Sequence, residues 1–252
     1  LHARRADLWI RAGLDLEATV LHEATADSPQ AAAALLAEAA ARAPLTLCAG
    51  VGPEGEQALE AAGFRPVGYF QRWAIGRDRA WPEPAAMALA LWPAFDLPPW
   101  PDGFDADPVW DRGVHRLRSR GERQWLLRGA TPGIEVFTAL VDNEPRAYAA
   151  LREQPGPAGP ELVLVDGWAP AAEGEAFAAG LAHLARQRRR TFIASLLAEA
   201  WAPAFAAAGF ELLSPRWLLW IRLREDDVLL AAALLRRETW FLTALDVELD
   251  GW

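Results

Sequence analysis

The sequence predicts an α/β fold in which one strand–helix–strand–helix–strand unit occurs twice, about 146 residues apart. Each copy contains Ala-Ala-Gly-Phe, at 61–64 and at 207–210, and each ends on Arg-Trp, at 72–73 and at 216–217. An internal repeat fixes the architecture, because each copy is expected to form the same supersecondary unit. Strand–helix–strand connections predict parallel pairing through a right-handed crossover.

The order of the elements supports the repeat better than the four shared letters do. The first copy predicts a strand at 16–24, an Ala-rich helix over Gln30–Ala43, a strand at 45–51, a short helix that ends at Gly63, and a strand at 64–75. The second predicts a strand at 161–169, a helix over Glu173–Arg189, a strand at 191–197, a short helix that ends at Gly209, and a strand at 210–221.

Six prolines mark the boundary between the copies. They are Pro82, Pro84, Pro93, Pro98, Pro99 and Pro101. Each proline removes a backbone donor and blocks helix continuation, so we expect no continuous helix or sheet strand here, although a short helix at 85–92 fits between them. We therefore divide the chain into an N-terminal partial repeat at 1–80, a Pro-rich linker at 81–102 and a C-terminal domain at 103–252.

The segment after the linker predicts a helix over 105–120. Asp107 suits an N-cap followed by a proline in the first turn, and apolar residues recur at helical spacing. A second short helix is expected at 122–128. The alternating runs 135–141 and 146–153 flank a turn-rich tetrapeptide and predict antiparallel strands.

The end of the chain predicts one more helix and one more strand. The helix covers 226–237, with acidic residues at its start and arginines at its end, as the helix dipole favours. The strand covers 239–249. The second half therefore combines parallel and antiparallel pairing in a mixed sheet with helices packed on it.

The first copy is incomplete when it is aligned with the second. Its start at Leu1 corresponds to about residue 147, so the preceding helix and most of the hairpin have no counterpart. Three explanations are open. The elements were lost, they lie upstream of Leu1, or the C-terminal helix and strand take their place in three dimensions.

The net charge of −9 and the pI of about 5.0 argue against a nucleic-acid-binding protein, which needs a basic face for the phosphates. They suit neutral or cationic small partners. All 25 basic residues are arginine, which we attribute to the composition of the coding sequence rather than to function.

Cys48 is the single cysteine of the chain, so an internal disulfide and a cysteine-only metal site are excluded. It lies in an apolar run and is expected to be a buried, inert thiol. None of the four histidines forms a short-spaced ligand pair, so no metal is implied. No apolar run reaches membrane-spanning length and no secretory signal is visible, so we expect a cytoplasmic protein without a membrane partner.

The pairs Gly63-Phe64 and Gly209-Phe210 each follow a short helix and open a strand. Together with the order of the elements, they resemble the GNAT superfamily of N-acetyltransferases. The resemblance implies two GNAT-like mixed-sheet repeats, in which 103–223 covers a whole domain and 1–77 only its latter part. The chain thus looks like a tandem GNAT protein.

The resemblance implies acetyl-CoA as cofactor, bound where two parallel strands splay apart and with its pyrophosphate at a helix start. Backbone N–H groups and the positive end of a helix hold an anion there. In the second copy, Val163 and Val165 on the strand and Gly174, Glu175 and Ala176 at the helix start match the cofactor-binding positions. Glu175 and its neighbour Glu173 oppose phosphate binding, and an ordinary helix start explains these residues equally well.

In the first copy, the corresponding helix start lacks glycine, so we expect that its cofactor site has been lost. The family commonly uses a tyrosine on its fourth helix as general acid, but Leu59 and Phe205 take that position here. Asp166 is the candidate catalytic base in the second copy, with a solvated strand end as the alternative. His22 and Glu23 take the equivalent place in the first.

Several other residues have both a functional and an ordinary interpretation. Trp168 and Trp201 adjoin the predicted cleft and are candidates to line the substrate pocket, although most of the 13 tryptophans should be packing residues. The arginines at 186–190 suit a solvated helix end. Acids alternate over 246–250, which fits a wet edge strand or a surface that attracts an amine.

Two functions are consistent with the sequence. The first is an acyl-CoA-dependent N-acyltransferase that transfers an acetyl group to an amine of a small molecule or peptide. The second is a catalytically degenerate tandem protein that binds a ligand or a partner. The intact strand order around Gly174 favours the enzyme, whereas the missing tyrosine and the altered loops favour the scaffold. We expect the enzyme, with the acceptor, the acyl chain and the oligomeric state left open.

Overall fold

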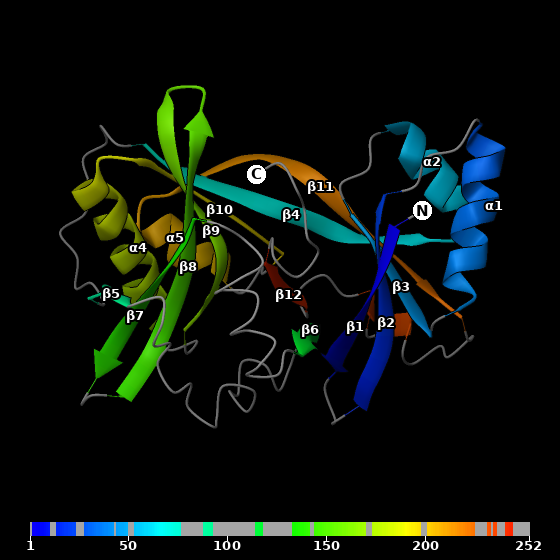
Figure 1. Cartoon of the computed structure of the whole chain (residues 1–252), viewed down its shortest axis with the longest axis horizontal. Helices are drawn as coiled ribbons and strands as arrows, with labels where there is room; N and C mark the ends of the chain where they lie inside the picture. Colours follow the sequence, from blue (N-terminus) through cyan, green and yellow to red (C-terminus); the bar gives the residue numbers. More distant parts are fainter. Residues whose placement is uncertain are drawn as a thin grey trace.

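The computed structural model describes residues 2–10, 14–23, 28–42, 44–49, 53–76, 88–92, 114–117, 133–141, 144–169, 173–197, 201–224, 231–232, 234–235 and 240–243. In this part of the chain, a mixed sheet of 12 strands runs through both copies, with the helices packed against it (Figure 1). The structure thus confirms the predicted α/β class.

The first half contains β1 (His2–Ile10), β2 (Leu14–Glu23), α1 (Pro29–Ala40), β3 (Leu45–Cys48), α2 (Pro53–Ala61) and β4 (Arg65–Ile75). The second contains β5 (Ala90–Trp92), β6 (Val114–Leu117), β7 (Ile134–Val141), β8 (Glu144–Gly156), β9 (Gly159–Trp168), α4 (Gly174–Arg188), β10 (Thr191–Leu197), α5 (Ala202–Ala207), β11 (Glu211–Leu223) and β12 (Trp240–Thr243). Every predicted element of both repeat units is present.

The two copies also pair their strands in the same way. The parallel pair β2–β3 of the first copy corresponds to the parallel pair β9–β10 of the second. The antiparallel pair β1–β2 corresponds to β8–β9. Gly63 and Gly209, at the ends of the two short helices, adopt φ angles of +81° and +87°, a left-handed conformation that favours glycine. The copies therefore share backbone geometry as well as element order.

The two copies exchange their last strands. The sheet order is β3-β11-β4-β10, so β11 of the second copy lies beside β3 of the first, and β4 of the first lies beside β10 of the second. Leu45–Cys48 pair with Trp220–Leu223, and Gln71–Ile75 pair with Phe192–Leu196. Between these contacts, β4 and β11 pair antiparallel with each other. Each copy thus completes the sheet of the other (Figure 1).

The strands next to β1 show what occupies the place of the elements missing from the first copy. β6 pairs antiparallel with β1, in the place that β7 takes beside β8, and β12 pairs with β6. β12 also pairs with β10, so β10, β4, β11, β3, β2, β1, β6 and β12 form a closed ring of neighbouring strands. Segments from after the first copy therefore extend its sheet, but the strand directly beside β1 is β6 and not the C-terminal strand that the third explanation proposed; the C-terminal strand, β12, comes next to β6.

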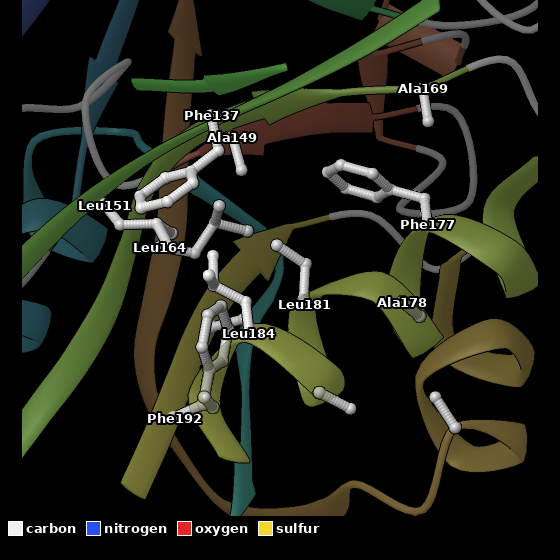
Figure 2. Close-up of a cluster of buried hydrophobic side chains, with 14 of the residues drawn as sticks. Phe137, Ala149, Leu151, Leu164, Ala169, Phe177, Ala178, Leu181, Leu184 and Phe192 are labelled. Atoms are coloured by element: carbon white, nitrogen blue, oxygen red, sulfur yellow. The ribbon is translucent and has the colours of Figure 1, made fainter. Parts of the chain in front are cut away.

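Two faces of the sheet are buried in different ways. On one face, side chains of α4 such as Phe177, Leu181 and Leu184 pack against Leu164 and other apolar residues of the C-terminal strands (Figure 2). On the other face, apolar residues of β2, β3, β4, β11 and β12 form one cluster together with Leu234. This cluster fills the interior of the ring of strands. Cys48 is buried and free, as predicted.

Three predictions for the middle of the chain were wrong. Within the span predicted as a helix, 105–120, residues Val114–Leu117 form a strand, β6, because pairing with β1 and β12 overrides the helical spacing. The proline-rich linker contains a strand, β5, which pairs with β7 at the sheet edge, where proline-flanked strands are tolerated. The short helix predicted at 85–92 is therefore replaced by strand at 90–92. The predicted helix at 122–128 lies outside the described residues.

Candidate active site

A fork between two parallel strands forms the centre of the candidate site. Glu161–Leu164 of β9 pair with Thr191–Ala194 of β10 in parallel, as the crossover connection predicts, and Val163 lies directly opposite Ile193. Pairing ends there, although β9 continues to Trp168 and β10 to Leu197. The two strands therefore separate after Leu164 and Ala194.

A β-bulge at Val165 accompanies this separation. Leu151 pairs with Leu164 whereas Ala150 pairs with Asp166, so β9 has one residue more than β8 at this point. A bulge changes the direction in which the following side chains point. Leu164 lies opposite Leu151 and faces α4 (Figure 2). Asp166 lies opposite Ala150, the residue next to Leu151, and neighbouring residues of a strand point to opposite faces. Asp166 therefore projects from the face of the sheet that is turned away from α4. Val165 is buried and packs against Ile134.

Asp166 is a buried residue with a specific partner. Its carboxyl Oδ2 accepts a hydrogen bond of 2.9 Å from the Tyr148 hydroxyl, and the two residues are only 4% and 2% exposed. Solvated strand-end residues are not buried in this way, so the structure argues against the ordinary interpretation of Asp166. Tyr148 was not singled out from the sequence, because only the register of β8 against β9 brings it to Asp166.

More polar side chains share this face of the sheet. Tyr148 lies opposite Trp168 on one side and opposite Thr138 on the other. Ser195 follows Ala194, the partner of Leu164, and therefore also projects from the face of Asp166. Thr138 and Ser195 are fully buried, and within the described residues their hydroxyl oxygens have no hydrogen-bond partner. Neither was recognisable from the sequence, because an isolated hydroxyl in an apolar strand has no pattern.

The start of α4 follows the fork in the chain. Its N-cap residue, Glu173, makes no side-chain capping hydrogen bond. Gly174 is buried, and a Cβ atom added to it would make only ordinary contact, at 3.7 Å from the Cβ of Ala204. Glu175 is exposed and Ala176 half-buried. The first N–H groups of α4 thus have no capping side chain from Glu173, while solvent can screen the charge of Glu175.

The corresponding helix of the first copy is capped differently. Ser28 is the N-cap of α1, and its hydroxyl accepts a hydrogen bond of 3.2 Å from the backbone N–H of Ala31. This bond satisfies a donor that an anion would otherwise use. His22 and Glu23 lie at the end of β2, and nothing is described of their side chains. The cap agrees with the expectation that the first copy has no phosphate site.

Aromatic residues near the fork belong largely to the core. Trp201 is 5% exposed and contacts Phe177 of α4 edge-on, with ring centroids 5.3 Å apart. Phe205, where the resemblance to the GNAT superfamily implies a tyrosine, is fully buried and packs against Trp73, Trp201 and Phe210. Trp168 is 8% exposed. Trp201 therefore packs between the helices, and a substrate-lining role for either tryptophan stays a prediction.

The arginines at the end of α4 have structural partners. Arg188 forms an ion pair with Glu135 at 3.2 Å and lies over the ring of Phe137, and Arg190 pairs with Glu153 at 3.2 Å. These contacts join the end of α4 and the start of β10 to the hairpin. The alternating acids at 246–250 lie outside the described residues.

Two kinds of site are not seen in the described part of the chain. It contains no group of three or more His, Cys, Asp or Glu side chains that could hold a metal ion. None of its helices has both the length and the apolar character needed to cross a membrane.

No family model matches the chain, and no curated protein matches it. Solved structures do match. A GCN5-related N-acetyltransferase from Anabaena variabilis ATCC 29413 has a TM-score of 0.62 at 13% identity, over 88% of this chain and 59% of that chain. A probable N-acyltransferase from Enterococcus faecalis V583 has a TM-score of 0.55 at 14% identity, over 88% and 58%. Eis1 from Mycobacterium abscessus has a TM-score of 0.54 at 18% identity, over 91% and 62%.

The chain spans about three fifths of the length of these structures. At such low identities the likeness concerns the fold alone. The splayed parallel strands, the Gly-Phe strands and these superpositions agree with one another. The chain has the fold of the GNAT superfamily of N-acetyltransferases.

Proposed function

We propose that the protein transfers an acyl group from coenzyme A to an amine of a small molecule or peptide, and that the C-terminal copy carries the site. The observation that supports this best is the fork between β9 and β10, which is followed directly by a helix start without a side-chain cap. The first copy, with its helix capped by Ser28, has a structural role. The division into an N-terminal partial repeat at 1–80, a linker at 81–102 that includes β5, and a C-terminal domain at 103–252 stays a prediction. A cytoplasmic location also stays a prediction.

The residues of the second copy suit acyl-CoA. Backbone groups of Val163 and Val165 border the fork, and the N–H groups of Gly174, Glu175 and Ala176 are available to the pyrophosphate. When bound, the cofactor supplies an activated thioester. Exclusion of water from this region strengthens any hydrogen bond made to the acyl group.

Asp166 is proposed to accept the proton of the acceptor amine, because an amine must lose its proton to become acylated. The Tyr148 hydroxyl binds one carboxyl oxygen and so fixes the orientation of the carboxyl group beside the fork. Trp168, on the same face, is proposed to contact the acceptor. The amine itself and the oligomeric state are not identified by this arrangement.

A second function, a scaffold without catalysis, is favoured by one observation. Phe205 occupies the position of the family's tyrosine and is buried among aromatic rings, so this position of α5 offers no hydroxyl to a leaving thiolate. In that case the thiolate would leave as the anion or take its proton from water. The two functions therefore differ in turnover and can share cofactor binding.

Calorimetric titration with acetyl-CoA tests the proposal. We expect micromolar binding that is weakened at least about tenfold by Gly174→Glu, which adds a negative charge at the phosphate position. Gly76→Glu adds the same charge in open space near the other end of β10 and should leave binding unchanged. Absence of binding at millimolar acetyl-CoA would remove the acyltransferase. Binding without acyl transfer to any of a panel of amines would favour the scaffold.

A further inference from the structure

The fork between β9 and β10 contains a strand from the end of the chain. Leu196 of β10 pairs with Gln71 of β4 and also with Thr243 of β12. A strand has two edges, so β12 must use the edge of β10 that β9 uses as far as Ala194. β12 also approaches β9, and Figure 1 shows it next to the end of β10. β12 therefore lies inside the fork.

The stretch of β10 that remains between its two partners is short. Ala194 is the last partner of β9 and Leu196 the first partner of β12, so Ser195 alone lies between them along this edge. These two residue steps span about 7 Å. Ser195 Oγ is fully buried and has no hydrogen-bond partner within the described residues, although buried hydroxyls usually have one. Ser195 thus presents a polar group to a small ligand on the Asp166 face of the sheet, beside this gap.

β12 is held firmly in this place. Trp240 and Leu242 are 2% and 1% exposed and belong to the apolar cluster inside the ring of strands. The indole N–H of Trp240 donates a hydrogen bond of 2.8 Å to the backbone oxygen of Leu234. Moving β12 away from β10 would expose these side chains and break this bond, so β12 forms a fixed wall.

We propose that β12 is an end stop that limits the acyl group in the fork to the size of acetyl, with the Ser195 hydroxyl as the hydrogen-bond donor to the thioester oxygen. This inference rests on the proposed function, because it assumes that the thioester enters the fork. A long acyl chain cannot fit between Ala194 and Leu196 and would have to displace Thr243 and Leu242 from β10. The substrate class is therefore short-chain acyl-CoA.

Calorimetry with CoA, acetyl-CoA and octanoyl-CoA tests the end stop. On the wild-type chain, octanoyl-CoA should bind at least about tenfold more weakly than acetyl-CoA. Thr243→Pro weakens the pairing of β12 with β10, because proline lacks the N–H group and fits poorly in a paired strand. In this variant, we expect the affinity for acetyl-CoA to exceed that for octanoyl-CoA by less than about threefold, while the affinity for CoA itself stays unchanged.

A double variant, Leu197→Cys with Leu242→Cys, fixes the stop in place. These residues are direct antiparallel partners, and such partners have Cα atoms within the range that a disulfide spans. Cys48 does not interfere, because it is buried and its pKa is raised to about 12. The oxidised protein should bind acetyl-CoA as the reduced protein does and should still discriminate against octanoyl-CoA.

Three results would overturn the end stop while leaving the acyltransferase intact. The first is that the wild type or the oxidised variant binds acetyl-CoA and octanoyl-CoA equally well. The second is that Thr243→Pro prefers acetyl-CoA over octanoyl-CoA as strongly as the wild type does. The third is that oxidation of the double variant alone abolishes acetyl-CoA binding. The last result would mean that β12 must leave before the cofactor enters. Failure of CoA and both thioesters to bind any of the proteins would instead remove the proposed function and the end stop together.

Discussion

The Tyr148 hydroxyl and the Asp166 carboxyl group are joined by a hydrogen bond of 2.9 Å in the interior of the C-terminal copy. The bulge at Val165 makes this contact possible, because it turns Asp166 away from α4 and toward the face that carries Tyr148. The same backbone irregularity thus lies where β9 leaves β10 and places the candidate base.

The first prediction concerns this hydrogen bond. Tyr148→Phe keeps the buried ring but leaves a buried carboxyl oxygen without one of its donors, so the free energy of unfolding should fall by about 1–3 kcal/mol. Urea denaturation measures it. Thr138→Val is the matched control, because it removes a buried hydroxyl directly opposite Tyr148 that has no partner within the described residues. The control should be neutral or stabilising, and equal losses in both variants would contradict the assignment.

The second prediction concerns the helix ends of the repeat. Gly63→Ala and Gly209→Ala should each lower the free energy of unfolding by about 1–2 kcal/mol, because alanine is strained at φ angles of +81° and +87°. Gly76 has no positive φ, and a Cβ atom added there would meet open space, so Gly76→Ala should change stability by less than about 0.5 kcal/mol. Thermal unfolding of the three variants side by side makes the comparison. A loss in Gly76→Ala as large as in the others would show that φ is not the cause.

The third prediction places at Phe205 the tyrosine that the GNAT resemblance implies. Phe205→Tyr should cost about 1–3 kcal/mol of stability, since Phe205 is fully buried against Trp73, Trp201 and Phe210 and the new hydroxyl enters an aromatic environment. Chemical denaturation measures the loss. A variant as stable as the wild type would mean that the hydroxyl reaches an acceptor, and would reopen the question of a general acid on α5.

The fourth prediction concerns Cys48, whose pKa burial raises from 9.0 to about 12. The folded protein holds this proton more tightly than the unfolded chain. Its contribution to stability is therefore complete below about pH 9 and is lost as the pH rises toward about 12, at up to about 1.4 kcal/mol per pH unit. The difference between the wild type and Cys48→Ala in pH-dependent urea denaturation isolates this group. If that difference stayed constant from about pH 8 to about pH 11, the thiol would not be buried.

The sequence was sufficient to predict the elements of both repeats, because their hydrophobic patterns and terminal glycines are local signals. It also predicted that the strands at 161–169 and 191–197 pair in parallel, since the crossover connection determines this pairing. It did not predict β1, β5 or the strand at Val114–Leu117. These strands depend on partners far away in the chain, and short strands carry little pattern of their own.

The candidate site was predicted only in part. Asp166 was identified from its place at a strand end, but its burial and its bond to Tyr148 follow from the register of β8 and β9. Ser195 was missed because its significance depends on where β9 ends and where β12 begins along β10. Arg188 and Arg190 were expected at a solvated helix end, and the sequence did not predict their carboxylate partners, because these lie on other strands.

The exchange of β4 and β11 makes the halves of the chain interdependent. Without β11, the outer edge of β3 would present unpaired N–H and C=O groups, and without β4 the same would be true of β10. Neither half can therefore be removed without leaving the sheet of the other half incomplete. Each copy thus serves as the scaffold on which the other copy folds.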